Sequence, residues 1–164
     1  MANIILPVQS AKIFGDFITL GSQIEHADGM WKLLFDDSQT ESCLWQFRLP
    51  DTYDSSPILN LTYAMASATS DKIDLEADIM AISNGDVQDI DSASFDTINE
   101  ISGGTTVPGT AGNIDQVDII LTNNDSWQSG DLVIIRLHRD HDDADDTATG
   151  DVEVLTATLK YTSA

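Results

Sequence analysis

The sequence predicts an all-β protein, specifically an antiparallel β-sandwich of jelly-roll type with about eight strands and one long crossover. Apolar and polar residues alternate at period two in several segments, which is the spacing of side chains on a strand with one buried face. Turn-forming residues separate these segments, and the sequence shows no heptad or internal repeat. The chain has 164 residues, of which 41% are hydrophobic, and this length predicts one domain.

The expected strands are distributed along the whole chain. Alternation is clearest at 58–66, where the core-facing residues would be Leu59, Leu61, Tyr63 and Met65. Near the C-terminus, the core-facing row would be Leu155, Ala157, Leu159 and Tyr161. The strand segments in order are 13–18, 31–35, 43–49, 58–66, 72–82, 116–122, 131–139 and 151–162.

Two of these segments carry features that bear on function. In residues 72–82 the apolar row alternates with Asp74, Glu76 and Asp78, which we expect to face solvent. Residues 131–139 begin with apolar side chains on both faces. That pattern is typical of a central strand covered on both sides, or of a strand in a subunit contact.

The long crossover is expected at residues 84–113. Its first part, 89–101, could form one or two helical turns, because its apolar residues are loosely spaced as on a helix: Ile90, Phe95, Ile98 and Ile101. A return rich in glycine, threonine and proline follows. We therefore expect this segment to connect strands in different sheets.

The charge of the chain is strongly negative, with 28 acidic residues against 7 lysines and arginines and a formal net charge of -21. Nucleic acid is excluded as a partner, because binding it depends on cationic side chains that displace counterions from phosphates. The same field would repel anionic membranes. The N-terminus lacks a basic region and a signal-like apolar stretch, so we expect neither a cleaved signal nor a membrane span.

The stretch HRDHDDADDTATGD, residues 138–151, holds two histidines and six aspartates. It does not fit an EF-hand, because counting from Asp140 places Ala144 at position five and Asp151 at position twelve. It also lacks the helical histidine pair or the cysteines of a zinc site. We interpret it as the solvated tip of a hairpin, with calcium binding as the alternative, and we assign no metal and no cofactor.

No catalytic motif is present, and we expect the protein not to be an enzyme. There is no Gly-x-Ser-x-Gly, no phosphate loop and no serine, histidine and aspartate arrangement. The single cysteine, Cys43, lies among apolar residues and is interpreted as a buried, inert thiol. Trp45 is expected in the core, whereas Trp127 lies in a turn sequence and is the tryptophan expected to be exposed for ligand or partner contact.

The first 20 residues are expected to form an N-terminal arm or an edge strand, and residues 21–164 the single sandwich domain. The segment is more apolar and less acidic than the rest of the chain. It must therefore either add a strand to its own sheet or lie against a neighbouring molecule. The candidate partner-binding residues are Ile4, Ile5, Leu6, Val8 and Ile13, together with Trp127.

Several stretches between residues 31 and 163, above all DSASFDT, VPGTAG and DTATGDVEVL, resemble small virion structural proteins of tailed bacteriophages, cyanophages especially. Some members of that family are capsid decoration, or cement, proteins. The resemblance implies a jelly-roll sandwich that assembles as a homotrimer on the icosahedral shell. It also implies the major capsid protein as partner, synthesis in the host cytoplasm and a final location on the capsid exterior.

The function expected from these observations is stabilisation of a phage capsid by protein–protein contacts. Contacts that span several capsid subunits would stabilise the assembled shell by mass action. A second hypothesis is a carbohydrate-binding tail or head-fibre module that uses Trp127 and the acidic loop. A third is a glycoside-active enzyme whose carboxylates have no local signature.

Overall fold

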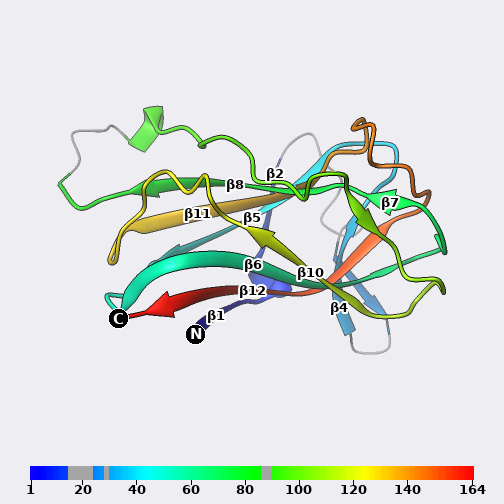
Figure 1. Cartoon of the computed structure of the whole chain (residues 1–164), viewed down its shortest axis with the longest axis horizontal. Coiled ribbons are helices and arrows are strands. Elements are labelled where there is room, and N and C mark those ends of the chain that lie inside the picture. The colour runs from blue at the N-terminus through cyan, green and yellow to red at the C-terminus, as the bar shows by residue number, and fades with distance from the viewer. Residues whose placement is uncertain (15–23, 28–29, 86–89) are drawn as a thin grey trace.

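The computed structural model describes residues 1–14, 24–27, 30–85 and 90–164, and these form two antiparallel β-sheets packed face to face (Figure 1). The expected domain boundary at residue 20 lies outside the described residues. The strands are β1 (Ala2–Leu6), β2 (Lys12–Phe14), β3 (Ile24–Ala27), β4 (Met30–Phe35), β5 (Glu41–Arg48), β6 (Tyr53–Met65), β7 (Lys72–Ile73), β8 (Leu75–Ile82), β9 (Thr105–Thr106), β10 (Asp115–Ile120), β11 (Leu132–Arg139) and β12 (Val152–Ser163).

Strands that follow each other in the sequence often lie in different sheets. Sheet A has the order β10-β6-β12-β4-β3, and β1 pairs with β12 beyond the end of β4. Sheet B has the order β2-β5-β11-β8, and β7 and β9 form a small third sheet. The predicted all-β, antiparallel sandwich of jelly-roll type is confirmed.

The core lies between the two sheets and is built from the alternating apolar residues. The predicted inward rows of β6 and β8 are buried, as are Val117, Ile119 and Leu121 of the β10 segment. The C-terminal row is predicted correctly only from Ala157 onward. A bulge between Val154 and Thr156 shifts the register of β12, so Val152 and Val154 face the core before it and Ala157, Leu159 and Tyr161 after it.

The acidic stretch is not a hairpin tip, which corrects the sequence-based interpretation. β11 belongs to sheet B and β12 to sheet A, so residues 140–151 cross from one sheet to the other. The crossing is organised by Arg139, whose side chain is fully buried. Its guanidinium donates to both carboxylate oxygens of Asp146 (2.8 and 2.7 Å) and to the carbonyl oxygens of Phe35 (3.3 Å), Ala148 (2.7 Å) and Gly150 (2.9 Å).

The predicted helical turns of the long crossover are wrong except for one 3-10 turn, η2 (Ile90–Ser92). Residues 95–99 instead run along the free edge of β8. Ala77 and Asn99 exchange two backbone hydrogen bonds (2.9 and 2.7 Å), and the Asn99 side chain donates to the Ala77 carbonyl oxygen at 3.1 Å. Backbone pairing with the strand edge therefore prevails over the weak helical spacing. The helices of the described residues are all too short to cross a membrane.

The N-terminal arm is part of its own domain in the described structure. β1 pairs with β12 over its whole length, and Leu6 and Val8 are buried in the core, Val8 in the short 3-10 turn η1 (Val8–Ser10). Ile4 packs partly against the core, whereas Ile5 remains 74% exposed. Ile13 lies in β2, where its backbone is in register with Cys43, and its side chain is outside what the structure describes.

Replacing Arg139 by methionine should lower the free energy of unfolding by about 3–5 kcal/mol, because the variant leaves Asp146 buried without its counterion. Urea unfolding followed by far-UV circular dichroism measures this change. Arg48→Met is the matched control, since the Arg48–Asp51 ion pair is exposed and should cost about 0–1 kcal/mol. A loss below about 1 kcal/mol for Arg139→Met would contradict the role of this guanidinium.

The Cys43 thiol should not react with Ellman's reagent at pH 8 while the protein is folded. Cys43 is buried in the core, so the reagent cannot reach it. Burial also raises the pKa of its thiol, so little of the reactive thiolate is present at pH 8. Addition of guanidinium chloride should release one equivalent of thiol per chain. Full labelling of the folded protein within minutes would show that this part of the core opens readily.

Candidate functional site

On the outer face of sheet B, the register of the strands aligns outward-pointing side chains into rows that run across the sheet. Each row takes one outward side chain from β5, β11 and β8, since the residues between them point into the core. Three consecutive rows are Leu44–Arg136–Asp78, Gln46–Ile134–Met80 and Arg48–Leu132–Ile82.

A groove of about 250 Å³ lies over the first two rows. Its floor is apolar and half-buried, formed by Leu44, Met80 and Ile134, although a water-facing sheet surface is ordinarily polar. In the sequence, this surface is indicated by residues 131–139, which have apolar side chains on both faces of the expected strand and include Ile134. The complete lining is Lys12, Leu44, Gln46, Met80, Phe95, Ile134 and Arg136.

Phe95 forms one side of the groove, and the crossover holds it there. The next residue, Asp96, donates its backbone N–H to the Ile79 carbonyl oxygen at 2.8 Å, which fixes the segment beside β8. The Phe95 ring lies 4.3 Å from the guanidinium carbon of Arg136. Arg136 in turn donates through Nε to Asp78 at 2.9 Å, and through Nη2 to the other oxygen of the same carboxylate. The aromatic ring and the guanidinium are thus held rigidly at the groove wall.

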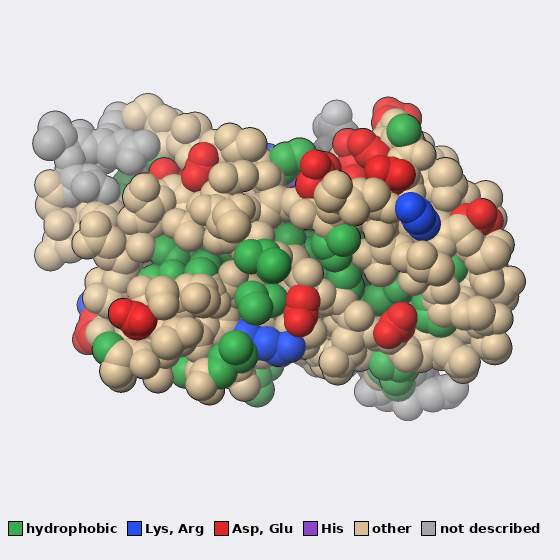
Figure 2. All heavy atoms as spheres, in the orientation of Figure 1, with side chains coloured by type: hydrophobic (Ala, Val, Ile, Leu, Met, Phe, Trp, Pro, Cys, Tyr) green, Lys and Arg blue, Asp and Glu red, His purple; other side chains and the backbone are tan. Residues whose placement is uncertain are grey.

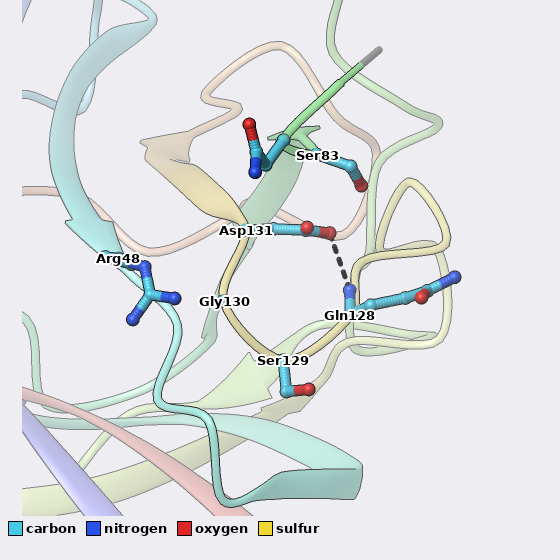
Figure 3. A pocket seen from close by; sticks show the side chains of 7 residues that line it. Arg48, Ser83, Gln128, Ser129, Gly130 and Asp131 are labelled. Carbon is cyan, nitrogen blue, oxygen red and sulfur yellow. Dashed lines mark hydrogen bonds between the residues drawn. The ribbon is translucent and has the colours of Figure 1, made fainter.

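A polar pocket of about 330 Å³ lies at the end of the same sheet (Figure 3). Arg48 points toward Gly130 in this pocket, and Gly130 has a φ of +90°, a backbone conformation that favours glycine. Asp131 shapes the loop by accepting the backbone N–H of Gln128 at 2.7 Å. The lining is Arg48, Ser83, Asn84, Gln128, Ser129, Gly130 and Asp131.

The groove and the pocket lie along one line on the same face. Leu44 and Gln46 line the groove and Arg48, on the same side of β5, lines the pocket. At about 3.4 Å per residue, the four steps along the strand from Leu44 to Arg48 span roughly 14 Å. We call this continuous surface, from Lys12 and Phe95 to Arg48 and Asn84, the sheet-B track. It combines an apolar floor with amide, hydroxyl and guanidinium groups that can bind hydroxyl-rich ligands.

Trp127 does not contribute an exposed ring, which corrects the sequence-based expectation. Its side chain is only 5% exposed. Its Nε1–H donates to the Tyr53 hydroxyl at 2.7 Å, and the two rings meet edge to face with centroids 5.7 Å apart. Trp45 is buried as predicted and donates to the Pro7 carbonyl oxygen, which ties η1 to sheet B. Trp31, on β4 of sheet A, is exposed instead.

The described part of the sheet-B track includes none of the predicted arm residues. The side chain of Ile5 projects from β1 in sheet A, and those of Leu6 and Val8 are buried. The sequence analysis missed Gln46 and Asn84, and it placed Phe95 on one of the expected helical turns of the crossover. A lone glutamine or asparagine carries no motif, so only the register of three distant strands could have placed them together.

Acidic side chains gather at the end of the molecule opposite the polar pocket, where the loop after β11 lies (upper right in Figures 1 and 2). Asp74 and Glu76 are buried there, although the alternation of 72–82 predicted solvent-facing carboxylates. Burial, and then the charges of neighbouring carboxylates, raise the pKa of both Asp74 and Glu76 to about 7. These two residues and Glu100 bring one ligand atom each within 4.8 Å of the others.

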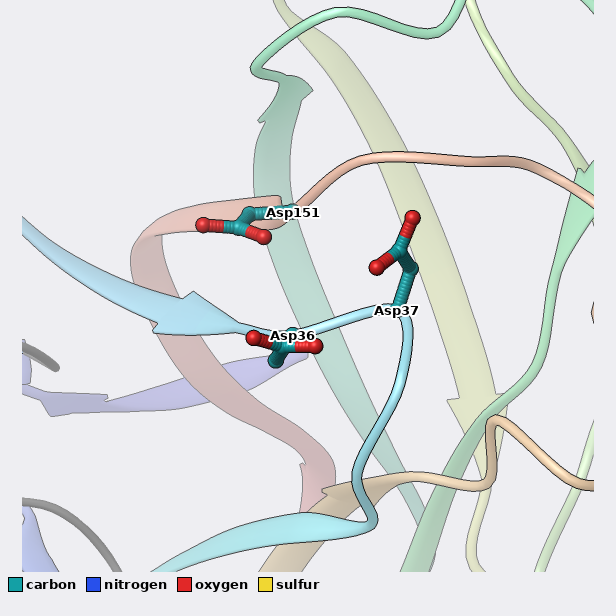
Figure 4. Close-up of side chains that lie close together, drawn as sticks. All are labelled: Asp36, Asp37 and Asp151. Carbon is teal, nitrogen blue, oxygen red and sulfur yellow. The ribbon is translucent and has the colours of Figure 1, made fainter.

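A second carboxylate cluster consists of Asp36, Asp37 and Asp151, which face one another beside the start of β12 (Figure 4). Two of its members accept backbone hydrogen bonds. Asp36 accepts the Ser38 backbone N–H at 2.7 Å, and Asp37 accepts the Gly150 backbone N–H. Burial, with the nearby charges of Asp36 and Asp37, raises the pKa of Asp151. This cluster is explained by turn formation.

Comparison with known proteins gives matches of fold only. No protein-family model matches the sequence, and no curated protein matches it significantly. A family 35 carbohydrate-binding module from Clostridium thermocellum matches with a TM-score of 0.54 and 13% identity, over 99% of this chain and 100% of that one. The xylan-binding module CBM15 matches with a TM-score of 0.50 and 13% identity, over 98% and 96%.

A non-crystalline cellulose-specific module, CBM28, also matches, with a TM-score of 0.53, 11% identity, and coverage of 94% of this chain and 89% of that one. The architecture is therefore the β-sandwich of carbohydrate-binding modules. The TM-scores establish the shared fold. Because the sequence identities are this low, the ligand has to be argued from the site itself.

These matches correct the resemblance to phage decoration proteins. The identification as a capsid cement protein is wrong, and so are the major capsid protein and the homotrimer as its partners. The quoted stretches that suggested it are mainly turns and connections in the structure: residues 91–97 run from within η2 into the segment after it, residues 107–112 form turns after β9, and residues 146–155 lead into the first residues of β12. Glycine, proline and aspartate recur in such positions because the backbone requires them, whatever the function.

Proposed function

We propose that the protein is a non-catalytic carbohydrate-binding module that holds a glycan chain along the sheet-B track. The observation that carries the proposal is the groove, in which an apolar floor that the described residues leave open lies beside the Phe95 ring and the polar groups of Gln46, Lys12 and Arg136. Sugar rings present C–H faces that pack on such surfaces and hydroxyls that require hydrogen-bonding partners. The likeness in fold to modules named for binding xylan and cellulose supports this class of ligand.

The length of the track favours a chain over a single sugar. Apolar contacts are concentrated in the groove, whereas the pocket offers Arg48, Asn84 and two serines for hydroxyl groups. A ligand that extends along the strands would use both regions at once, so modest contacts at each would add to a useful affinity. This arrangement needs no aromatic platform from Trp127.

The structural roles of the carboxylates at the track favour binding over catalysis. Asp78 is held by Arg136, and Asp131 accepts the Gln128 backbone N–H. Glycoside hydrolysis requires two carboxyl groups that face each other across the scissile bond. These two are committed to structural partners at opposite ends of the surface.

The proposal predicts that a soluble β-linked polysaccharide, such as xylan or hydroxyethyl cellulose, retards the protein in affinity gel electrophoresis. Gln46→Ala and Phe95→Ala should each weaken binding at least about tenfold, or ~1.4 kcal/mol, in titration calorimetry with the oligosaccharide that binds. Each removes a contact in the groove without touching the core.

Gln116→Ala is the matched control, because Gln116 is an exposed glutamine on the outer face of sheet A. It should bind as the wild type does. Absence of retardation by every glycan of a broad array, or equal losses in Gln46→Ala and Gln116→Ala, would refute the sheet-B track as a carbohydrate site.

A further inference from the structure

We propose that Asp74, Glu76 and Glu100 form a binding site for a divalent cation, with Ca²⁺ as the ion that the site fits. The proposal concerns the acidic end of sheet B. It is independent of carbohydrate binding, and its expected effect is on stability.

Strand pairing brings these three carboxylates together from two segments. Asp74 lies between β7 and β8, and Glu76 is the second residue of β8. The Ala77–Asn99 bridge places Glu100 beside Glu76 on the outer face, since neighbours of a paired residue face each other in an antiparallel ladder. One oxygen atom from each of the three lies within 4.8 Å of the others, which is the spacing of ligands around a single ion.

A buried oxygen without a partner points to a missing ligand in this cluster. Asp74 is only 2% exposed, and its Oδ1 has no hydrogen-bond partner. A buried carboxylate oxygen without a donor is costly, and native structures satisfy such atoms with protein, water or a metal ion. A cation bound by Asp74, Glu76 and Glu100 would satisfy this oxygen.

The positive groups of the neighbourhood are engaged elsewhere. Arg139 is saturated by Asp146 and three carbonyl oxygens, and Arg136 is paired with Asp78. Lys72 donates its ammonium to the Gly103 carbonyl oxygen at 2.6 Å. His138 faces Glu76 at 3.4 Å, but burial lowers the pKa of its imidazole, so it does not supply the charge. An external cation would balance the cluster, and it would be attracted further by Asp140 and Asp143 nearby.

The donor set selects a hard cation. All three ligands are carboxylates, which suit Ca²⁺, Mg²⁺ and Mn²⁺ over the softer metals that prefer thiolate or imidazole. Glu100 is exposed at the mouth of the cluster, so water can complete the coordination. Ca²⁺ accepts six to eight oxygen ligands in irregular geometry, whereas Mg²⁺ demands a near-ideal octahedron. An open cluster of two buried carboxylates and one exposed one fits calcium best.

Thermal unfolding of the full chain, first treated with EDTA and then titrated with CaCl₂, tests the site. At a Ca²⁺ concentration about a hundredfold above Kd, the melting temperature should rise by about 5 °C or more. Calorimetry should give one site per chain. Asp74→Asn and Glu100→Gln should each lose most of this rise.

Two comparisons separate a lost site from a damaged fold. In EDTA, Asp74→Asn should melt no lower than the wild type, because it removes a buried charge, and Glu100→Gln changes only an exposed side chain. Asp36→Asn, in the other carboxylate cluster, should keep the full calcium response. No response of the wild type to Ca²⁺, Mg²⁺ or Mn²⁺ would overturn the proposal, and so would a response that survives in both Asp74→Asn and Glu100→Gln.

Discussion

The buried guanidinium of Arg139 is the constraint on which one whole end of the molecule depends. It sits at the end of β11 in sheet B, yet its carbonyl acceptors Phe35, Ala148 and Gly150 belong to the strand ends of sheet A or to the approach to β12. All five N–H bonds are used. A buried charge of this kind is costly to leave unpaired, so an arrangement of the sheets that separated Arg139 from these acceptors would be strongly destabilised.

The same interaction determines where the acidic loop lies. Asp146, held by Arg139, also accepts the backbone N–H of Asp74 at 3.0 Å. The loop is pinned further by Asp140, whose backbone N–H donates to the Asp74 carbonyl oxygen, and by Ala148, which donates to that of Lys72. Asp74 is therefore covered by the loop, and a carboxylate that alternation assigns to solvent is removed from it. This burial raises the free energy of the ionised Asp74 carboxylate, and the surrounding carboxylates of a chain with a net charge of -21 raise it further.

Period-two alternation was sufficient to predict the fold class, because burial of one strand face is a local property of the sequence. It was sufficient for the core rows of β6 and β8, and for Cys43 and Trp45. It failed where a second chain segment covers an outer face, as over Asp74 and Glu76, and at the β12 bulge, where one extra residue reverses the pattern. The turn and connection residues within 91–97 and 146–151 misled for a related reason, since turn composition reflects backbone geometry and carries little information about function.

The sheet-B track and the acidic cluster share one structural support, and this explains why sequence could not reveal either. Phe95 at the groove and Glu100 at the cluster belong to the same stretch of crossover, in which Asp96 and Asn99 bond to Ile79 and Ala77 of β8. Asp96 also accepts the Asp125 backbone N–H, and Asn99 donates to the Asn123 carbonyl oxygen, so the loop that leads to the polar pocket is tied to the same segment. Each side chain gains its role from pairing with a strand edge. Among the described residues, the loop after β11 covers the acidic end of the outer face of sheet B and the crossover covers one edge. The apolar side chains in the middle of that face stay half-buried in the groove, and this is where the proposed ligand would contact them.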